Sequence, residues 1–214
     1  MAENNVKIIK KDGIKFSLAT ILLMLGCTYL IILSTFLQLD ITHVIIPGKI
    51  FSSEKLVFSD FLYTYKFIPQ IPVIMFIGAF LGRRFGLISI LLYIVLGLSF
   101  LPVFGLGGGP KYILEYGFGY ILAYVPAMIL ADIVLENGFS NKNILKASLI
   151  GVLTIHVLGI LYMLFIAGLQ HEGGAFIKGW IIAQSGIKII YDFVFSFAAL
   201  FTVRYAKIVL WFFM

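Results

Sequence analysis

The 214-residue chain has little charge for its length. Only 12% of its residues are charged and 61% are apolar, whereas average soluble domains have about 25% charged residues. The mean hydropathy is +1.07, and a soluble fold of this size cannot bury so much apolar surface. This composition excludes a soluble enzyme and a nucleic-acid-binding protein. It predicts a protein that is embedded in lipid.

Cysteine and the common catalytic motifs are also scarce. The single cysteine, Cys27, allows no disulfide within the chain and no cysteine-based metal site. The three histidines are far apart and lack the spacing of metal ligands. The sequence contains no P-loop, no G-x-S-x-G, no H-E-x-x-H and no close pair of carboxylates within one apolar run. We therefore expect no metal, no cofactor and no catalysis.

Long apolar runs predict an all-α integral membrane protein with six spanning helices in one bundle, since a span needs about 20 apolar residues. We place these helices at about residues 16–37, 70–82, 85–101, 116–134, 144–169 and 180–203. The first run is longer than the apolar part of a secretory signal, and we expect it to stay in the protein. Residues 39–68 are mixed in character, which predicts a loop outside the hydrocarbon, with room for a short helix against the membrane. Residues 1–214 are expected to form a single membrane domain.

The distribution of charge predicts an orientation. Six spans place both termini on one side, where we count ten Lys or Arg residues against four acids. The other side has six basic and six acidic residues. Because positive residues are enriched in cytoplasmic loops, both termini are predicted to be cytoplasmic. Membrane orientation thus explains the net charge of +6 without an anionic partner.

A glycine-rich segment follows the third predicted span. Gly105, Gly107, Gly108 and Gly109 remove four side chains over five positions, so the backbone there can approach another surface closely. Two interpretations stay open, a flexible hairpin between spans and a cover whose backbone groups contact a ligand. The flanking side chains combine apolar faces with polar tips, which suits a small amphipathic ligand. They are Phe104, Lys111, Tyr112, Glu115 and Tyr116.

Polar residues recur on one face of the last predicted span. Gln184, Lys188 and Asp192 are spaced by four, with Tyr191 and Phe195 beside them. Ionisable groups in a membrane are costly and usually face an interior or a water-filled cavity. Either Lys188 and Asp192 form an i,i+4 ion pair near the outer interface, or Asp192 accepts N–H groups of a ligand.

Two further polar residues lie alone in apolar spans. Gln70 begins the second span and is interpreted either as an interfacial cap or as a ligand contact, because its amide both donates and accepts. His156 lies within the fifth span, and we interpret it as a hydrogen-bonded residue of the bundle.

An ordered set of residues between positions 70 and 132 points to a family. The set is Gln70, Gly78, Gly82, Tyr93, Leu96-Gly97, Pro102-Val103-Phe104, Gly107-Gly108-Gly109 and Gly119-Tyr120. In this order it resembles the BioY-type family, the biotin-specific substrate-binding (S) components of energy-coupling factor (ECF) transporters. Asp192 matches an aspartate that the family has in its sixth helix.

The resemblance implies a multi-pass protein of a bacterial cell membrane that binds biotin from outside beneath its outward loops. It implies docking on a transmembrane scaffold subunit driven by two ATPase subunits, and toppling to release biotin inside. The ureido group of biotin needs an acceptor and a donor, which Asp192 and Gln70 can supply. The predicted ligand contacts are Gln70, Tyr93, Phe104, Gly107, Gly108, Gly109, Lys111, Tyr112, Tyr120, Lys188, Tyr191 and Asp192.

The usual basic partners of the biotin carboxylate are absent from this sequence. Many family members have an arginine in the glycine cluster and a lysine one helical step after the aspartate, where this chain has Gly108 and Phe195. Lys111, Lys188 and the backbone of residues 107–109 are the substitutes considered. An S component for another small vitamin or a biotin derivative, lipoate-like for example, is the alternative. A membrane subunit without a transport role is the third hypothesis.

Overall fold

The computed structural model describes residues 17–51 and 55–213. In chain order its main elements are α1 (Leu18–Phe36), β1 (Leu39–Val44), β2 (Leu62–Phe67), α2 (Gln70–Leu98), α3 (Phe118–Leu135), α4 (Asn141–Leu169), α5 (Gly174–Ser185) and α6 (Lys188–Phe213). Short 3-10 helices occupy the loops at η1 (Gly48–Phe51), η2 (Phe58–Phe61) and η3 (Pro110–Leu114). The N-terminal charges that entered the orientation argument, at residues 3–15, lie outside the described residues, as does Glu54.

Helices dominate the described part of the chain, as predicted. Within it, five stretches are long and apolar enough to cross a membrane: α1, α2, α3, α4 and the stretch Gly174–Lys207 that contains α5 and α6. This confirms a multi-helix membrane protein. The predicted count of six spans is not confirmed, and the reason lies in α2 and in the last stretch.

The helix α2 consists of two segments that meet at Gly82. Gly82 has φ 75° and ψ 171°, a conformation that side chains disfavour. A Cβ atom built on Gly86 would lie 3.1 Å from the Cα atom of Gly78, although eight residues of one straight helix span about 12 Å. The chain therefore reverses at Gly82. The segments on either side correspond to the predicted spans 70–82 and 85–101, the second of which ends earlier, at Leu98.

The last predicted span, 180–203, is wrong at its beginning. The helix breaks at Gly186, whose ψ is −111°, and a Cβ atom there would lie 2.4 Å from the carbonyl oxygen of Ile182. A new helix, α6, starts at Lys188. Gln184 therefore belongs to α5, and it does not continue the helix face of Lys188 and Asp192 as the spacing of four suggested.

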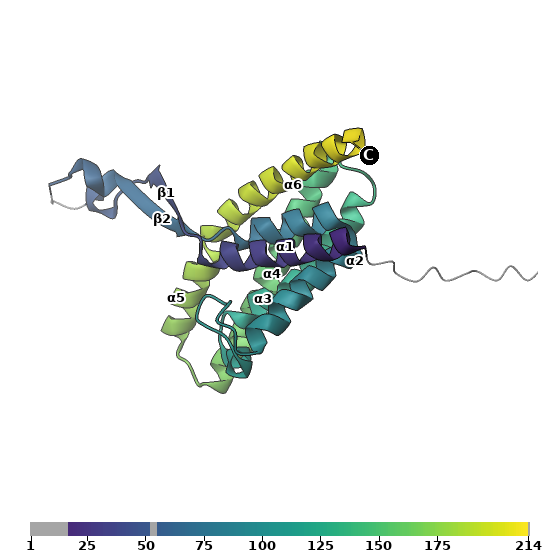
Figure 1. Ribbon diagram of the computed structural model, residues 1–214. Helices are drawn as coiled ribbons and strands as arrows, with labels where there is room; N and C mark the ends of the chain where they lie inside the picture. The colour runs from purple at the N-terminus through teal and green to yellow at the C-terminus, as the bar shows by residue number, and fades with distance from the viewer. Residues whose placement is uncertain (1–16, 52–54, 214) are drawn as a thin grey trace, which may run out of the picture.

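The loop predicted at residues 39–68 contains an antiparallel β-hairpin, which corrects the all-α expectation locally. Leu39 of β1 pairs with Phe67 of β2, and Val44 pairs with Leu62. The hairpin projects from one end of the bundle (Figure 1). Its base is held against α6 by aromatic stacking, with the ring centroids of Phe67 and Phe195 4.9 Å apart.

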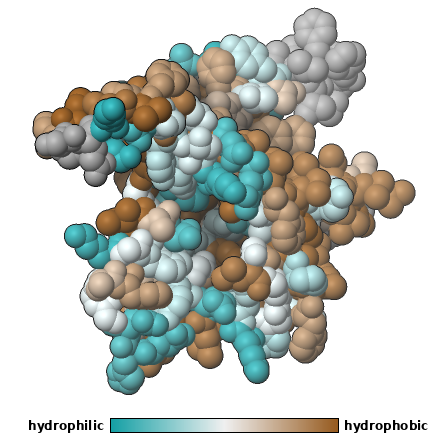
Figure 2. All heavy atoms as spheres, turned by 90° about the vertical axis from the view of Figure 1, so that its left-hand side faces the viewer, coloured by the Kyte–Doolittle hydropathy of each residue, from teal (hydrophilic) through white to brown (hydrophobic). Residues whose placement is uncertain are grey.

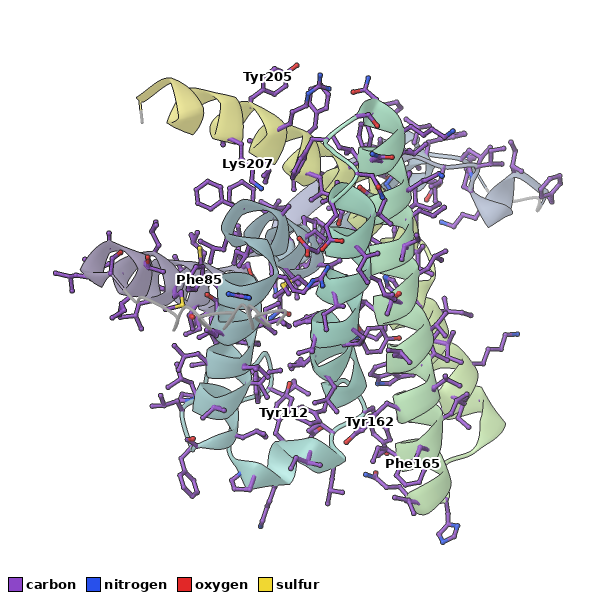
Figure 3. All side chains as sticks on the ribbon, turned by 90° about the vertical axis from the view of Figure 1, so that its right-hand side faces the viewer. Phe85, Tyr112, Tyr162, Phe165, Tyr205 and Lys207 are labelled. Carbon is purple, nitrogen blue, oxygen red and sulfur yellow. The ribbon has the colours of Figure 1, made fainter. Side chains whose placement is uncertain are left out.

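The two ends of the bundle differ in their chemistry. At one end Arg83 donates hydrogen bonds to Asp132 at 2.9 Å and to Glu136 at 2.5 Å, and Arg204 donates to Asn141 at 2.8 Å. Tyr205 and Lys207 lie toward this end, while Tyr112 and Tyr162 lie at the other (Figure 3). An apolar cluster packs beside the charged end and is formed by Met75, Ala79, Ala131, Leu135, Ile144, Ala147, Leu200 and Val203.

Candidate functional site

A cavity of about 420 Å³ lies at the end of the bundle that has the glycine-rich loop and α5. Its volume is within the range of small-molecule pockets, about 300–1,000 Å³. Figure 2 views this end, where the surface is hollowed between hydrophilic and hydrophobic side chains. The cavity is lined by Thr35, Gln38, Ile68, Gln70, Ile71, Tyr93, Gly105, Leu106, Tyr112, Glu115, Tyr116, Gly117, Tyr120, Ile121, Tyr124, Trp180, Gln184 and Lys188.

Gln70 is held rigidly at one side of the cavity. It is the first residue of α2 and follows the N-cap residue Pro69. Its amide nitrogen donates to the hydroxyls of Thr35 and Tyr93, both at 2.8 Å. Its amide oxygen accepts a hydrogen bond from Tyr124 at 2.8 Å. Both amide hydrogens are thus used, and the remaining capacity of Gln70 is a lone pair on its oxygen.

Aromatic rings form the wall beneath the glycine-rich loop. Phe104 is fully buried and packs edge-on against Tyr93, with 5.2 Å between ring centroids. Its ring fills the space over Gly97, where a Cβ atom would lie 2.0 Å from the ring. Tyr112 packs 4.5 Å from the ring of Phe104 and lines the cavity. Phe104 therefore packs behind Tyr112, and Tyr112 is the ring of this pair that faces the cavity.

The glycine-rich loop is tied down by its backbone. Phe104 and Gly107 exchange backbone hydrogen bonds of 2.9 and 3.0 Å, and the N–H of Gly109 donates to the carbonyl of Gly97 at 2.7 Å. Gly107 and Gly109 have positive φ angles, and a Cβ atom on Gly108 would lie 2.0 Å from the carbonyl oxygen of Leu101. Gly105 and Leu106 face the cavity, whereas residues 107–109 are not part of its lining.

A buried ion pair lies on α6, which packs against α2. Lys188 donates to Oδ2 of Asp192 at 2.5 Å, so the i,i+4 ion pair, one of the two interpretations left open, is present. Nε2 of His156 lies 3.0 Å from the same oxygen. Asp192 and His156 are 0% and 1% exposed, and Lys188 is 16% exposed at its side chain. Lys188 lines the cavity and separates it from Asp192.

A series of hydrogen bonds connects the ion pair, through His156, to two hydroxyl groups. Nδ1 of His156 lies 2.8 Å from Oγ of Ser185, and that oxygen lies 2.6 Å from the hydroxyl of Tyr120. The prediction of His156 as a hydrogen-bonded bundle residue is confirmed. The series links α3, α4, α5 and α6, and its two ends, Tyr120 and Lys188, both line the cavity.

The loop before α3 and the helix α5 form the rest of the wall. Tyr116 donates hydrogen bonds to Glu172 at 2.7 Å and to Gln170. The hydrogen bond to Glu172 raises the pKa of Tyr116 to about 12, because it favours the protonated phenol. The ring of Trp180 packs 5.7 Å from that of Tyr120.

The structure brings five of the twelve predicted contacts to the cavity: Gln70, Tyr93, Tyr112, Tyr120 and Lys188. The other seven lie elsewhere. Phe104 and Asp192 are buried behind the lining, Gly107, Gly108 and Gly109 lie in the loop away from it, and Lys111 is exposed. Tyr191 bonds to His43 of the hairpin at 2.9 Å.

Several lining residues were missed by the sequence argument. Tyr124 follows Tyr120 by four positions on α3, and this helical spacing could have identified it. Thr35 is one of several small polar residues in α1, and Trp180 resembled an interfacial aromatic, so neither gave a local signal.

Comparisons with known proteins agree with this architecture. The BioY family model matches residues 10–210. A probable biotin transporter BioY from Lysinibacillus sphaericus is 34% identical over 45% of this chain and 50% of its own length. One from Pyrococcus horikoshii is 34% identical over 51% of this chain and 64% of its own length. The chain therefore spans between half and two thirds of the length of these relatives in the matched segments.

A solved structure shares the fold. The crystal structure at 2.1 Å of the S-component for biotin from an ECF-type ABC transporter superposes with a TM-score of 0.63 and 21% sequence identity, covering 88% of this chain and 90% of that one. Because the family model extends over nearly the whole sequence, the chain belongs to the BioY family.

Proposed function

We propose that this chain captures biotin and acts as the substrate-binding S component of an ECF-type vitamin transporter. The observation that carries the proposal is the cavity of about 420 Å³ between Gln70 and Lys188. It combines aromatic walls with a few fixed polar groups, the usual construction of a site for a small molecule. The names of the matched relatives and of the solved structure support the same ligand.

The hydrogen-bond partners in the cavity suggest how the ureido group would be held. The amide hydrogens of Gln70 are already used, so Gln70 offers its oxygen to a ligand N–H. The ammonium of Lys188 donates one hydrogen to Asp192, and its other hydrogens can be donated to the ureido carbonyl. Asp192 then acts through Lys188 and His156, without touching the ligand. The thiophane ring would pack against Tyr112 and Trp180.

The topology completes the proposal. We place six crossings in one membrane domain over residues 1–214, counting the two antiparallel segments of α2 separately. Both termini are cytoplasmic, in a bacterial cell membrane. Residues 70–81 are fewer than the 20 or so of a full span, which leaves Gln70 recessed below the outer surface. The partners are a scaffold subunit in the membrane and two ATPases, which would supply the hydrolysis that this chain lacks.

One observation favours an uncharged relative of biotin as a second candidate ligand. Among the described residues, Lys188 is the one basic side chain that lines the cavity, and it is already paired with Asp192. Glu115 lines the same cavity and would repel a carboxylate. A biotin amide, or a lipoate-like amide, would avoid the need for a basic partner.

Binding to detergent-purified protein tests both candidates. We expect biotin to bind with a 1:1 stoichiometry in calorimetry, and Lys188→Met to abolish this heat while Lys111→Met, a matched change outside the cavity, preserves it. Biotin amide binding more tightly than biotin would select the second candidate. Absence of binding by biotin, its amide and lipoate would contradict a vitamin-capturing function. Uptake of labelled biotin by cells with and without an ECF module tests the partners.

A further inference from the structure

The buried series of hydrogen bonds that begins at Asp192 runs in one direction, so each group in it is either the donor or the acceptor toward its neighbour. A carboxylate only accepts hydrogen bonds, and Oδ2 of Asp192 lies 3.0 Å from Nε2 of His156. Nε2 must therefore carry a hydrogen, since two lone pairs facing each other at this distance would repel.

The second nitrogen of His156 is then an acceptor. Lys188 already balances the charge of Asp192 at 2.5 Å, and a protonated ring that is 1% exposed would add an unpaired charge inside the bundle. The ring is therefore neutral, and its Nδ1 atom has a lone pair. Ser185, 2.8 Å away, donates its hydroxyl hydrogen to Nδ1.

The same assignment of donor and acceptor extends to Tyr120, which lines the cavity. Because the hydrogen of Ser185 is spent on His156, its oxygen accepts from the hydroxyl of Tyr120 at 2.6 Å. The hydrogen of Tyr120 thus points away from the cavity that this residue lines. What Tyr120 offers to a ligand is a lone pair on its oxygen.

We infer that Tyr120 accepts a hydrogen bond from a ligand N–H group, and that His156 is a positioning residue that fixes Tyr120 in this role through Ser185. The inference rests on the proposed function for the presence of a ligand with N–H donors. Together with the free lone pair of Gln70, it supplies two acceptors whose orientation is fixed by hydrogen bonds, as many as the two N–H groups of a cyclic urea require. Because Ser185 holds the hydrogen of Tyr120, the Tyr120 hydroxyl cannot turn to donate. A ligand atom without a hydrogen would therefore bring its lone pair against the lone pair of Tyr120, and such a ligand should bind more weakly.

The test compares biotin with two analogues in which a ring oxygen replaces one or the other ureido N–H. We expect the wild-type protein to bind one analogue at least about tenfold more weakly than biotin, the scale of one lost hydrogen bond. Ser185→Ala frees the Tyr120 hydroxyl to rotate and donate to the ring oxygen, so this ratio should fall toward one. His156→Phe and Tyr120→Phe should lower it as well.

Tyr162→Phe is the matched control. Tyr162 is not part of the cavity lining, and its hydroxyl donates to the carbonyl of Ile113, so the affinity ratio should stay at the wild-type value. A ratio that is unchanged in Ser185→Ala and His156→Phe, with biotin still bound, overturns this inference and leaves the proposed function standing. A wild-type protein that binds neither biotin nor its analogues overturns both.

Nitrogen-15 NMR of histidine-labelled protein provides a measurement that needs no ligand. The signals absent from His156→Phe belong to His156, and they should show a neutral ring with the hydrogen on Nε2. A hydrogen on Nδ1 would reverse the donor and acceptor roles of Ser185 and Tyr120 and overturn the inference. This result does not depend on how well the other variants fold.

Discussion

Gln70 and Tyr93 are joined by a hydrogen bond of 2.8 Å although both belong to α2 and 23 positions separate them. In one straight helix they would be about 35 Å apart. The reversal at Gly82 alone brings them together, so the fold of the site depends on one backbone conformation.

Gly82→Ala should therefore damage the site. Its φ of 75° with ψ of 171° is a region occupied almost only by glycine, and a side chain there costs about 1–3 kcal/mol. We expect a lower melting temperature and weaker ligand binding. Gly26→Ala in α1 is the control, because a Cβ atom there meets nothing within 4 Å, and it should leave both unchanged or raise stability. Equal stability of the two variants would contradict a strained turn.

Gln70→Leu should reduce both stability and binding. The leucine leaves the hydroxyl of the buried Tyr124 without its acceptor, which costs about 1–3 kcal/mol for a buried polar group. The double variant Gln70→Leu/Tyr124→Phe removes that orphan group and should recover part of the stability without restoring ligand affinity. Denaturation followed by circular dichroism, together with calorimetry, separates the two effects.

Asp192→Asn should weaken biotin binding by about 1–3 kcal/mol, the scale of a hydrogen bond to a charged group. The change leaves Lys188 without its ion-pair partner. Replacing both residues, in Lys188→Met/Asp192→Leu, should recover stability relative to Lys188→Met alone, because no buried charge is left unpaired. Binding should stay lost in the double variant. Wild-type affinity in Asp192→Asn would contradict the proposed role of Asp192 in holding Lys188 for the ligand.

Trp180 offers an optical signal for binding. It lines the cavity, and the chain has two tryptophans, so ligand binding should change the fluorescence of the wild-type protein. Trp180→Phe should abolish the change while calorimetry still detects the ligand. A change that persists in this variant would place the ligand outside the cavity.

Tyr116 should resist ionisation by alkali. Its hydrogen bond to Glu172 raises its pKa to about 12, above the ordinary value of 10.0. A raised pKa of this kind contributes stability that is fully present below pH 10 and is lost as the pH rises through about 12. Several tyrosines should ionise late in an ultraviolet absorbance titration, and one of these late phenols should move to lower pH in Glu172→Gln.

The sequence allowed a multi-helix membrane protein and five of the lining residues to be predicted, because apolar length and helical spacing are local properties. Gln70 and Lys188 could be named on these grounds, whereas Tyr120 was named from the family resemblance. The break at Gly186 was missed because the spacing of four between Gln184, Lys188 and Asp192 fits one face of a continuous helix. Asp192 was expected at the ligand because a buried carboxylate suggests one. Only the packing shows that His156 and Lys188 already bond to its Oδ2 atom, while its Oδ1 atom is buried and has no hydrogen-bond partner among the described residues.

The cavity reaches the solvent near the hairpin, the glycine-rich loop and α5, while Arg83, Asp132 and Glu136 close the opposite end above packed alkyl side chains. The apolar cluster therefore lies between the cavity and the charged end, and the cavity serves one side of the bundle. If the proposed transport function holds, release on the other side would require the helices to separate or the subunit to reorient.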